Sequence, residues 1–241
     1  VLIFVKVSDE FKDNIGTEAV NRNGLMQRAI KEIKNCVPEI TIISDIALDP
    51  YSIYGHDGIV KNNRILNDET NDVLCEMALS HAEAGVDIVA PSDMMDGRVL
   101  SIRKTLEKNN FDNTAIMSYG AKYASSFYGP FRNALESNPG FGDKKTYQMD
   151  FANRKEAIVE IAADIEEGAD IIMIKPGIAY LDIVYEIKNS FNIPLAVYQV
   201  SGEYAMVKAA SKMGYLDHNK IMMEQLISIK RAGANLSLIH I

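Results

Sequence analysis

The sequence has few cysteines and no long apolar run. Its two cysteines, Cys36 and Cys75, belong neither to a CxxC pair nor to a Cys/His pattern with metal-ligand spacing. Isolated thiols of this kind are typical of free, buried or half-buried residues, and they favour a reducing compartment such as the cytoplasm. No apolar stretch approaches the roughly 18–20 residues that span a bilayer, so we expect no membrane partner.

Positive charge is also in short supply. The chain has 25 lysines and arginines against 33 aspartates and glutamates, a formal net charge of −8. We expect no nucleic-acid partner, because nucleic acids are bound by basic faces. No GxGxxG or Walker-type loop follows a strand-like segment, which disfavours a nucleotide-binding sheet. The remaining composition, 47% hydrophobic and 24% charged, is that of a globular protein.

Short apolar segments rich in valine and isoleucine recur along the chain, and a helical pattern follows each. They do not alternate with polar residues, which is typical of strands buried on both faces of a parallel sheet. The predicted strands are residues 1–7, 40–45, 86–91, 114–119, 170–175, 194–199 and 235–239. The predicted helices are 24–36, 68–84, 153–167, 181–190, 203–213 and 219–232, with another starting near Arg98.

The repeated strand–helix order shows no linker and no shift in composition, so we expect residues 1–241 to form one domain. Polar side chains gather directly after the strands, as they do at the C-terminal mouth of a (β/α)8 TIM barrel. We therefore predict an α/β fold of that class rather than an open, doubly wound sheet. Seven strands can be recognised where eight are needed, so we expect a barrel that lacks its first βα unit, upstream of Val1.

Two lysines stand where such a barrel has its active site. Lys175 ends the predicted strand 170–175, where apolar walls would disfavour the ammonium form and lower the lysine pKa. A neutral amine can attack a ketone and form a Schiff base; the alternative is a lysine in a surface ion pair. Lys122 follows strand 114–119, and a second lysine nearby would lower both pKa values by repulsion. Position alone leaves Lys122 open, and its aromatic, weakly charged surroundings favour a functional role.

Carboxylates follow the strand 40–45. Asp45, Asp49 and Asp57 would lie at the barrel mouth, where they suit a hard cation or a substrate amine. A solvated loop explains them equally well. His56 has no evident metal partners and is expected to be a hydrogen-bonding loop residue.

Other polar residues follow the remaining strands. Ser92 and Asp93 follow strand 86–91 and would face the mouth. Ser201, with the backbone N–H groups after it, could hold a carboxylate at a helix N-terminus. Three side chains further along the chain than Lys122 could clamp a carboxylate. They are Arg132, Lys144 and Gln148, and plain surface solvation remains open for each.

Four motifs occur in an order that one family shares. They read Ala90-Pro-Ser-Asp-Met-Met-Asp-Gly-Arg98, Ser118-Tyr-Gly-Ala-Lys122 with Phe127-Tyr-Gly-Pro-Phe-Arg132, Ile174-Lys-Pro-Gly177, and Tyr198-Gln-Val-Ser-Gly-Glu-Tyr204. Together they resemble porphobilinogen synthase, also called 5-aminolevulinate dehydratase, over about residues 1–235. The resemblance implies a lyase (hydro-lyase) that condenses two 5-aminolevulinate molecules into porphobilinogen with loss of two waters, in tetrapyrrole (heme, chlorophyll, cobalamin) biosynthesis.

The resemblance also implies a role for each candidate residue. Lys175 and Lys122 match the two Schiff-base lysines, for the substrates that form the propionate and acetate sides of the product. Ser201 matches the propionate-side carboxylate contact. The matched acetate-side contacts are Arg132, Lys144 and Gln148, and the residues around the substrate amines are Asp45 and Ser92.

The loop after strand 40–45 bears on the metal. Zinc-using members of the family carry three cysteines there, whereas this chain has Ala47, Asp49 and Asp57. Thiolates favour zinc and carboxylates favour magnesium, so the loop resembles the zinc-independent, aspartate-rich type and we expect no active-site zinc. Glu160 matches a carboxylate that helps hold an allosteric Mg²⁺ in many such members. Magnesium keeps several waters and needs few protein ligands.

The family further implies a homo-octamer, in the cytoplasm or, for a photosynthetic eukaryote, in a plastid. Its members have a longer N-terminal region and a last helix, so we expect this chain to be truncated at both ends. His240 stands near the place of a carboxylate-binding tyrosine. Two other hypotheses remain open. The chain is an inactive fragment of this enzyme, or it is another Schiff-base barrel lyase of the class I aldolase type, with a single essential lysine.

Overall fold

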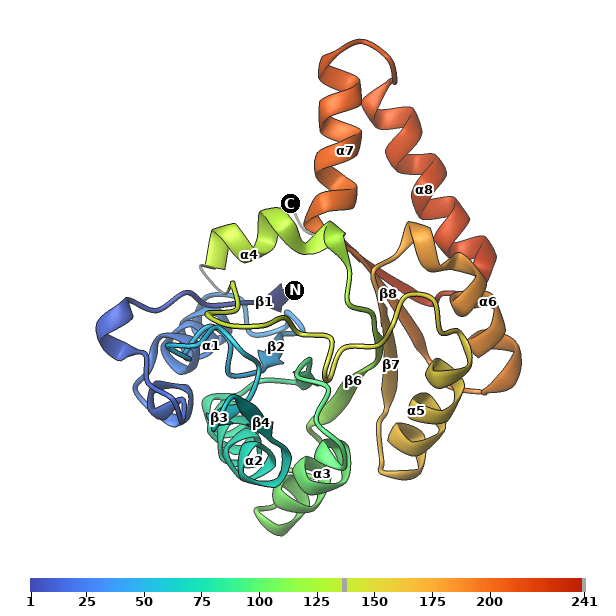
Figure 1. Ribbon diagram of the computed structural model, residues 1–241. Coiled ribbons are helices and arrows are strands. Elements are labelled where there is room, and N and C mark those ends of the chain that lie inside the picture. Colours follow the sequence, from blue (N-terminus) through green and yellow to red (C-terminus); the bar gives the residue numbers. More distant parts are fainter. Residues whose placement is uncertain (136–137, 240–241) are drawn as a thin grey trace.

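A seven-stranded parallel sheet forms the centre of the computed structural model, which describes residues 1–135 and 138–239 (Figure 1). Each strand pairs with the next, and all six pairings are parallel. The sheet curls into a barrel whose order does not close between its first and last strands within the described residues. In sheet order the strands are β1 (Leu2–Ile3), β2 (Ile43–Ile46), β5 (Ile88–Pro91), β6 (Ala115–Lys122), β7 (Ile171–Lys175), β8 (Leu195–Gln199) and β9 (Leu236–Ile239).

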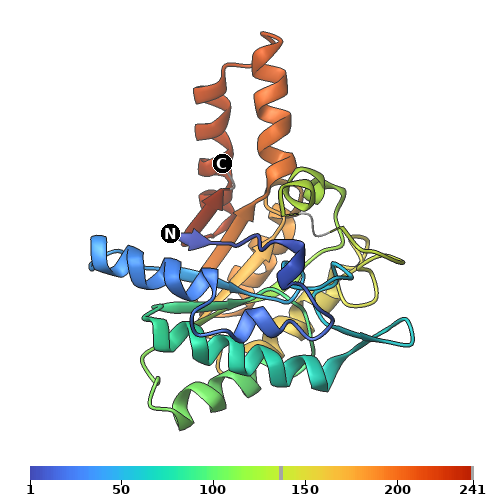
Figure 2. The ribbon, with the colours of Figure 1, turned by 90° about the vertical axis from the view of Figure 1, so that its left-hand side faces the viewer.

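Helices cover the outside of the barrel. The seven predicted helices are confirmed, with ends that move by one or two residues. They are α1 (Leu25–Cys36), α2 (Asn67–Ala84), α3 (Arg98–Lys108), α5 (Lys155–Glu166), α6 (Leu181–Ser190), α7 (Ser201–Lys212) and α8 (His218–Ala232). The sequence did not predict α4 (Gly129–Leu135) or the hairpin of β3 (Ile59–Lys61) and β4 (Arg64–Leu66). It also did not predict the short 3-10 helices Asp9–Phe11, Thr17–Val20, Ser126–Tyr128 and Ile178–Tyr180. The last two helices, α7 and α8, project beyond the barrel as a pair (Figures 1 and 2).

All seven predicted strands are present, but the first is shorter than expected. Only Leu2 and Ile3 of residues 1–7 find ladder partners, Ile43 and Ser44 of β2. The chain then leaves the sheet edge, and Val5 and Val7 are buried against the outer core instead. Apolar side chains of such a segment can therefore be buried outside a strand.

The alternation of side chains divides the core into two parts. Along each strand, every second side chain fills the inside of the barrel, and the side chains between them pack against the helices. The inner cluster consists of Ile43, Ala90, Met117, Tyr119, Tyr128, Met173, Ala196, Tyr198 and Val200. The outer core includes Ile42, Ile46, Val89, Ile172, Ile174 and Val197, together with the helices.

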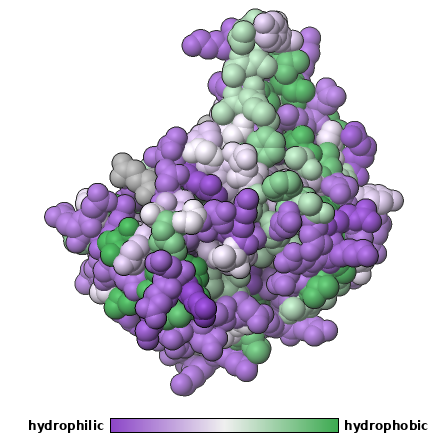
Figure 3. Space-filling model, viewed as in Figure 1, coloured by the Kyte–Doolittle hydropathy of each residue, from purple (hydrophilic) through white to green (hydrophobic). Residues whose placement is uncertain are grey.

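The surface seen in Figure 3 is largely hydrophilic, with apolar side chains on the projecting helix pair. Exposed apolar residues of α7 and α8 include Met206, Met223 and Ile227. Among the described residues, no helix is both long and apolar enough to cross a membrane. Cys75 is half-buried as expected, but the expectation was wrong for Cys36, which ends α1 on its solvent side and is exposed.

The buried His81 ties α2 to the outer face of β2. Its Nδ1 lies 2.8 Å from Ser44 Oγ, and burial lowers the pKa of His81 to about 3. A base with a lowered folded-state pKa contributes stability above its unfolded value of about 6.5, and that stability is lost as the pH falls below it.

We predict that lowering the pH from 7 to 5 costs about 2 kcal/mol of unfolding free energy through His81 alone, at about 1.4 kcal/mol per pH unit below 6.5. His81→Asn removes this part of the acid sensitivity, which urea unfolding at the two pH values measures. His218→Asn, on the half-buried start of α8, serves as the control. Equal acid sensitivity in the parent chain and in His81→Asn would contradict the assignment.

Candidate active site

The side chains that point into the barrel are apolar in its inner core and become polar toward the carboxyl ends of the strands. Asp45 follows Ile43 on β2, Ser92 follows Ala90 after β5, and Lys175 follows Met173 on β7, each two residues along. Because side chains alternate along a strand, these three share the inside of the barrel at its carboxyl end. Lys122 joins them, since its Cα pairs in register with that of Lys175 across β6 and β7.

A β-bulge places Lys122 on this side. Met117 and Tyr119 point inward, so strict alternation would send Lys122 outward to the helices. The register between β6 and β7 instead shifts between Ser118 and Ala121, which adds one residue to β6. At Gly120 an added Cβ would lie 2.8 Å from Ile161 of α5, so glycine allows the close approach of strand and helix. The extra residue restores the inward direction at Lys122.

Lys175 is held inside an aromatic box and is 5% exposed. Its Nζ lies 4.6 Å from the ring centroid of Tyr198, 5.2 Å from Phe131, and 5.3 Å from both Tyr119 and Tyr128. Burial, followed by repulsion from the neighbouring Lys122, lowers the pKa of Lys175 to about 7. A large fraction of this amine is therefore neutral near physiological pH, as a nucleophile requires.

Lys122 has polar partners instead. It is 6% exposed, its Nζ donates to the carbonyl oxygen of Ser92, and the same nitrogen lies 3.8 Å from Asp57 Oδ1. Its nearest aromatic ring, that of Tyr119, has its centroid 6.0 Å away. The two lysines therefore share one wall but differ in their immediate neighbours.

A second buried cation, Lys144, completes the charge balance beside Lys122. Its Nζ lies 3.3 Å from Asp57 Oδ2 and 3.2 Å from Asp49 Oδ2. Although burial acts to raise the pKa of Asp57, Lys122 and Lys144 hold it at about 2. Asp57 is therefore an anion between two ammonium groups.

Asp45 has the opposite character. Burial and the nearby Asp49 raise the pKa of Asp45 to about 7, although Lys122, Lys175 and a hydrogen bond with Ser92 act against that shift. A carboxyl group that changes its protonation near neutral pH can accept and return a proton.

The other predicted binding residues surround this group. Arg132 of α4 stacks on Tyr128, with its guanidinium carbon 5.5 Å from the ring centroid. Ser201 Oγ accepts a hydrogen bond from the backbone N–H of Phe131 at 3.0 Å. Gln148 is buried one residue before Met149, whose N–H donates to the carbonyl oxygen of Lys122 at 3.0 Å. All three thus border the wall around the two lysines.

One predicted direction was wrong. Asp93 does not face the mouth, because its Oδ2 lies 3.7 Å from Arg98 Nε on the outer side of the sheet. His56 is a hydrogen-bonding loop residue as expected, with Nδ1 3.0 Å from the Tyr147 hydroxyl and Nε2 3.1 Å from the carbonyl oxygen of Phe141.

Sequence reasoning missed the aromatic box and Glu203. Tyr119, Tyr128 and Tyr198 all lie within motifs singled out above, but their shared direction depends on the barrel. Glu203 accepts from the N–H groups of Val200 at 2.7 Å and Ile178 at 2.6 Å, and so joins the start of α7 to the turn after Lys175. Glu203 stands at the N3 position after the N-cap Val200, where glutamate often caps a helix, and that spacing is the signal that could have identified it.

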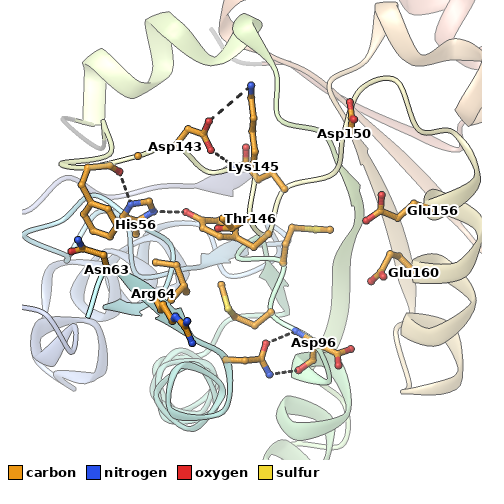
Figure 4. A pocket seen from close by; sticks show the side chains of 18 residues that line it. His56, Asn63, Arg64, Asp96, Asp143, Lys145, Thr146, Asp150, Glu156 and Glu160 are labelled. Atoms are coloured by element: carbon orange, nitrogen blue, oxygen red, sulfur yellow. Dashed lines mark hydrogen bonds and ion pairs between the residues drawn. The ribbon is translucent and has the colours of Figure 1, made fainter. Parts of the chain in front are cut away.

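Glu160 lies apart from the lysines, on α5. It borders a cavity of about 1000 Å³ between the β3–β4 hairpin, the segment 141–150 and α5. Figure 4 shows Asp96, Asp150 and Glu156 on the same cavity. Burial and the neighbouring carboxylates, Asp164 foremost, raise the pKa of Glu160. Over residues 1–135 and 138–239, no group of three His, Cys, Asp or Glu side chains could hold a metal.

The position of His240, predicted near a carboxylate-binding site, lies outside the described residues.

The fold and site define a class: a parallel α/β barrel with two buried lysines side by side at the carboxyl ends of neighbouring strands. The chain belongs to the family of delta-aminolevulinic acid dehydratases, whose family model matches residues 1–240.

Relatives from distant organisms agree with this assignment. The chain is 53% identical over 241 residues to the chloroplastic delta-aminolevulinic acid dehydratase of Glycine max, and it spans 58% of that protein's length. It is 56% identical over 229 residues to that of Methanothermus sociabilis, covering 95% of this chain and 71% of the relative. A crystal structure of the Toxoplasma gondii ME49 enzyme (porphobilinogen synthase), in complex with the reaction product porphobilinogen, superposes with a TM-score of 0.97 at 48% identity. That match covers 98% of this chain and 68% of the other.

We predict that Asp57→Asn lowers the unfolding free energy by about 3 kcal/mol, because it leaves two buried ammonium groups without their shared anion. Asp49→Asn is the matched control and costs about 1 kcal/mol, since Asp49 pairs with Lys144 alone and Lys144 keeps Asp57 as its partner. Urea unfolding at pH 7 measures both losses. Equal losses in the two variants would show that Asp57 is not the centre of the charge balance.

Proposed function

We propose that the chain carries the active site of a porphobilinogen synthase, which joins two 5-aminolevulinate molecules into porphobilinogen with loss of two waters. The observation that carries the proposal is the pair of lysines, in register on β6 and β7 and both buried. One amine can activate each substrate ketone. Two adjacent amines turn a bimolecular condensation into an effectively unimolecular one.

Each lysine has surroundings suited to this chemistry. The neutral Lys175 amine adds to a ketone carbon and water leaves, giving an imine. The protonated imine makes the neighbouring C–H more acidic, so that a carbon–carbon bond can form. Asp45 lies within the same group with a pKa near 7 and is suited to move the protons. Lys122 is assigned to the second substrate molecule, as the family motif implies.

Substrate carboxylates require cations and donors at the edge of the site. Ser201 stands at the first position of α7, where backbone N–H groups favour an anion. Arg132, Lys144 and Gln148 line the other side, and we assign them to the acetate-side substrate. Under this proposal, Asp49 and Asp57 keep Lys144 charged and in place.

Borohydride reduction tests the assignment of Lys175. Incubation with 5-aminolevulinate and borohydride should add the reduced substrate to the peptide that contains Lys175. The yield at early times should rise about tenfold from pH 6 to pH 8, because an amine of pKa about 7 goes from about 9% to about 91% neutral. Mass spectrometry of the digested chain identifies the labelled peptide and measures the yield of the adduct at each pH.

Lys175→Met abolishes this adduct, whereas Lys145→Met, at an exposed lysine, leaves it unchanged. Absence of any adduct on Lys175 in the parent chain overturns the proposal. Porphobilinogen formation that survives Lys122→Met would instead favour an aldolase-like enzyme with one essential lysine.

We further propose a zinc-independent enzyme with a Mg²⁺ ion at Glu160. Glu160 fits such an ion, because it is a half-buried carboxylate among other carboxylates, and Mg²⁺ held largely by water needs few protein ligands. At the mouth, Asp49 and Asp57 stand where zinc-using members have thiolates, and both pair with Lys144.

For a site of about 1 mM affinity, 10 mM MgCl₂ should stabilise the chain by about 1.4 kcal/mol. Thermal unfolding with and without the ion measures this gain. Glu160→Gln removes it, and Glu224→Gln, at an exposed residue of α8, retains it. An equal gain in both variants rules out Glu160 as the ligand.

We also propose a homo-oligomer, an octamer as in the resemblance above. Exposed apolar residues on α7 and α8 support a contact surface. For the compartment, we propose the cytoplasm or a plastid. Two unpaired cysteines favour a reducing environment, and several of the relatives are named as chloroplastic.

A further inference from the structure

The buried Arg98 has no part in the chemistry above, yet it reaches the bulge that directs Lys122. Arg98 is the first residue of α3 and is 2% exposed. Its Nη2 donates to Ser118 Oγ at 3.1 Å and to the carbonyl oxygen of Tyr119 at 3.3 Å. These residues begin the stretch in which the β6–β7 register shifts. A bulge interrupts the regular ladder, and the guanidinium supplies hydrogen-bond donors at that point.

Asp164 of α5 completes the contact with the bulge. Ser118 Oγ donates to Asp164 Oδ2 at 2.6 Å, and Arg98 Nη1 lies 3.4 Å from Asp164 Oδ1. The first residue of the bulged stretch is thus held between a buried cation and a buried anion.

The same guanidinium also holds the turn that receives the Lys122 side chain. Arg98 Nη1 donates to the carbonyl oxygen of Met95 at 3.1 Å, and Nε lies 3.7 Å from Asp93 Oδ2. Asp93 directly follows Ser92, whose carbonyl oxygen accepts from Lys122 Nζ. One side chain therefore connects the backbone that carries Lys122 with the backbone that binds its amine.

We propose that Arg98 is a positioning residue for Lys122, which holds the bulge of β6 and the 92–95 turn at a fixed separation. The planar guanidinium suits this task, because its five N–H groups can reach acceptors on α5, β6 and the turn at once. A lysine at this position would keep the charge but could not span them. The catalytic meaning of the inference rests on the function proposed for Lys122, but the geometric claim does not.

Reductive methylation of the parent chain and its variants tests the geometry. Formaldehyde and cyanoborohydride label Lys122 and Lys175, and mass spectrometry gives the ratio of their labelling rates between pH 6 and 9. In Arg98→Lys and in Ser118→Ala, we expect the Lys122/Lys175 ratio to rise at least about fivefold, because Nζ is released from the Ser92 carbonyl.

Arg103→Met is the matched control on the same helix. Arg103 donates to the carbonyl oxygen of Thr114, before β6 begins, and does not contact the bulge. In Arg103→Met, the Lys122/Lys175 labelling ratio should equal that of the parent chain. An unchanged ratio in both Arg98→Lys and Ser118→Ala, with native circular dichroism, overturns the proposal. Unfolding of Ser118→Ala would also overturn it, because the network would then support the whole fold rather than one lysine.

This labelling needs no 5-aminolevulinate, so the two proposals can fail separately. Loss of the proposed function appears as the absence of a substrate adduct in the parent chain. Failure of the positioning role appears as an unchanged labelling ratio in the variants.

Discussion

The site depends on the burial of two amines on one inner wall of the barrel. Strand alternation delivers Lys175 there without any irregularity, whereas Lys122 needs an extra residue in β6 to reach the same wall. A buried ammonium group is costly unless it is paired or loses its proton. The remainder of the site offsets that cost in a different way at each lysine.

At Lys122 the cost is offset by pairing with a carboxylate. Asp57 lies between Lys122 and Lys144, and Asp49 shares Lys144, so two carboxylates face two ammonium groups in a nearly dry space. At Lys175 the pKa is lowered instead, because aromatic rings surround the amine rather than carboxylates at ion-pair distance. Ring faces attract a cation weakly compared with the loss of its hydration, so burial dominates and lowers the pKa of the amine.

Much of this arrangement can be predicted from the sequence, for a physical reason. Non-alternating apolar segments located the barrel strands of the described residues, the helical patterns between them located the main helices, and polar residues after those strands marked the mouth. The bulge could not be predicted, because Gly120 within it lies against Ile161 of α5, far along the chain, and no local pattern indicates that approach. The β3–β4 hairpin was missed because its strands have three residues each; Asn62 and Asn63, both with positive φ, were its one signal.

The aromatic box shows the same limit more sharply. Tyr119, Tyr128, Phe131 and Tyr198 come from β6, the turn after it, α4 and β8, and no local pattern says that their rings converge on one nitrogen. That convergence makes the two lysines unlike. A condensation of two identical molecules into an asymmetric product requires that the protein treat the first differently from the second. Under the proposed function, this difference lies in the aromatic wall at Lys175 and the carboxylate at Lys122, and a symmetric pair of lysines could not supply it.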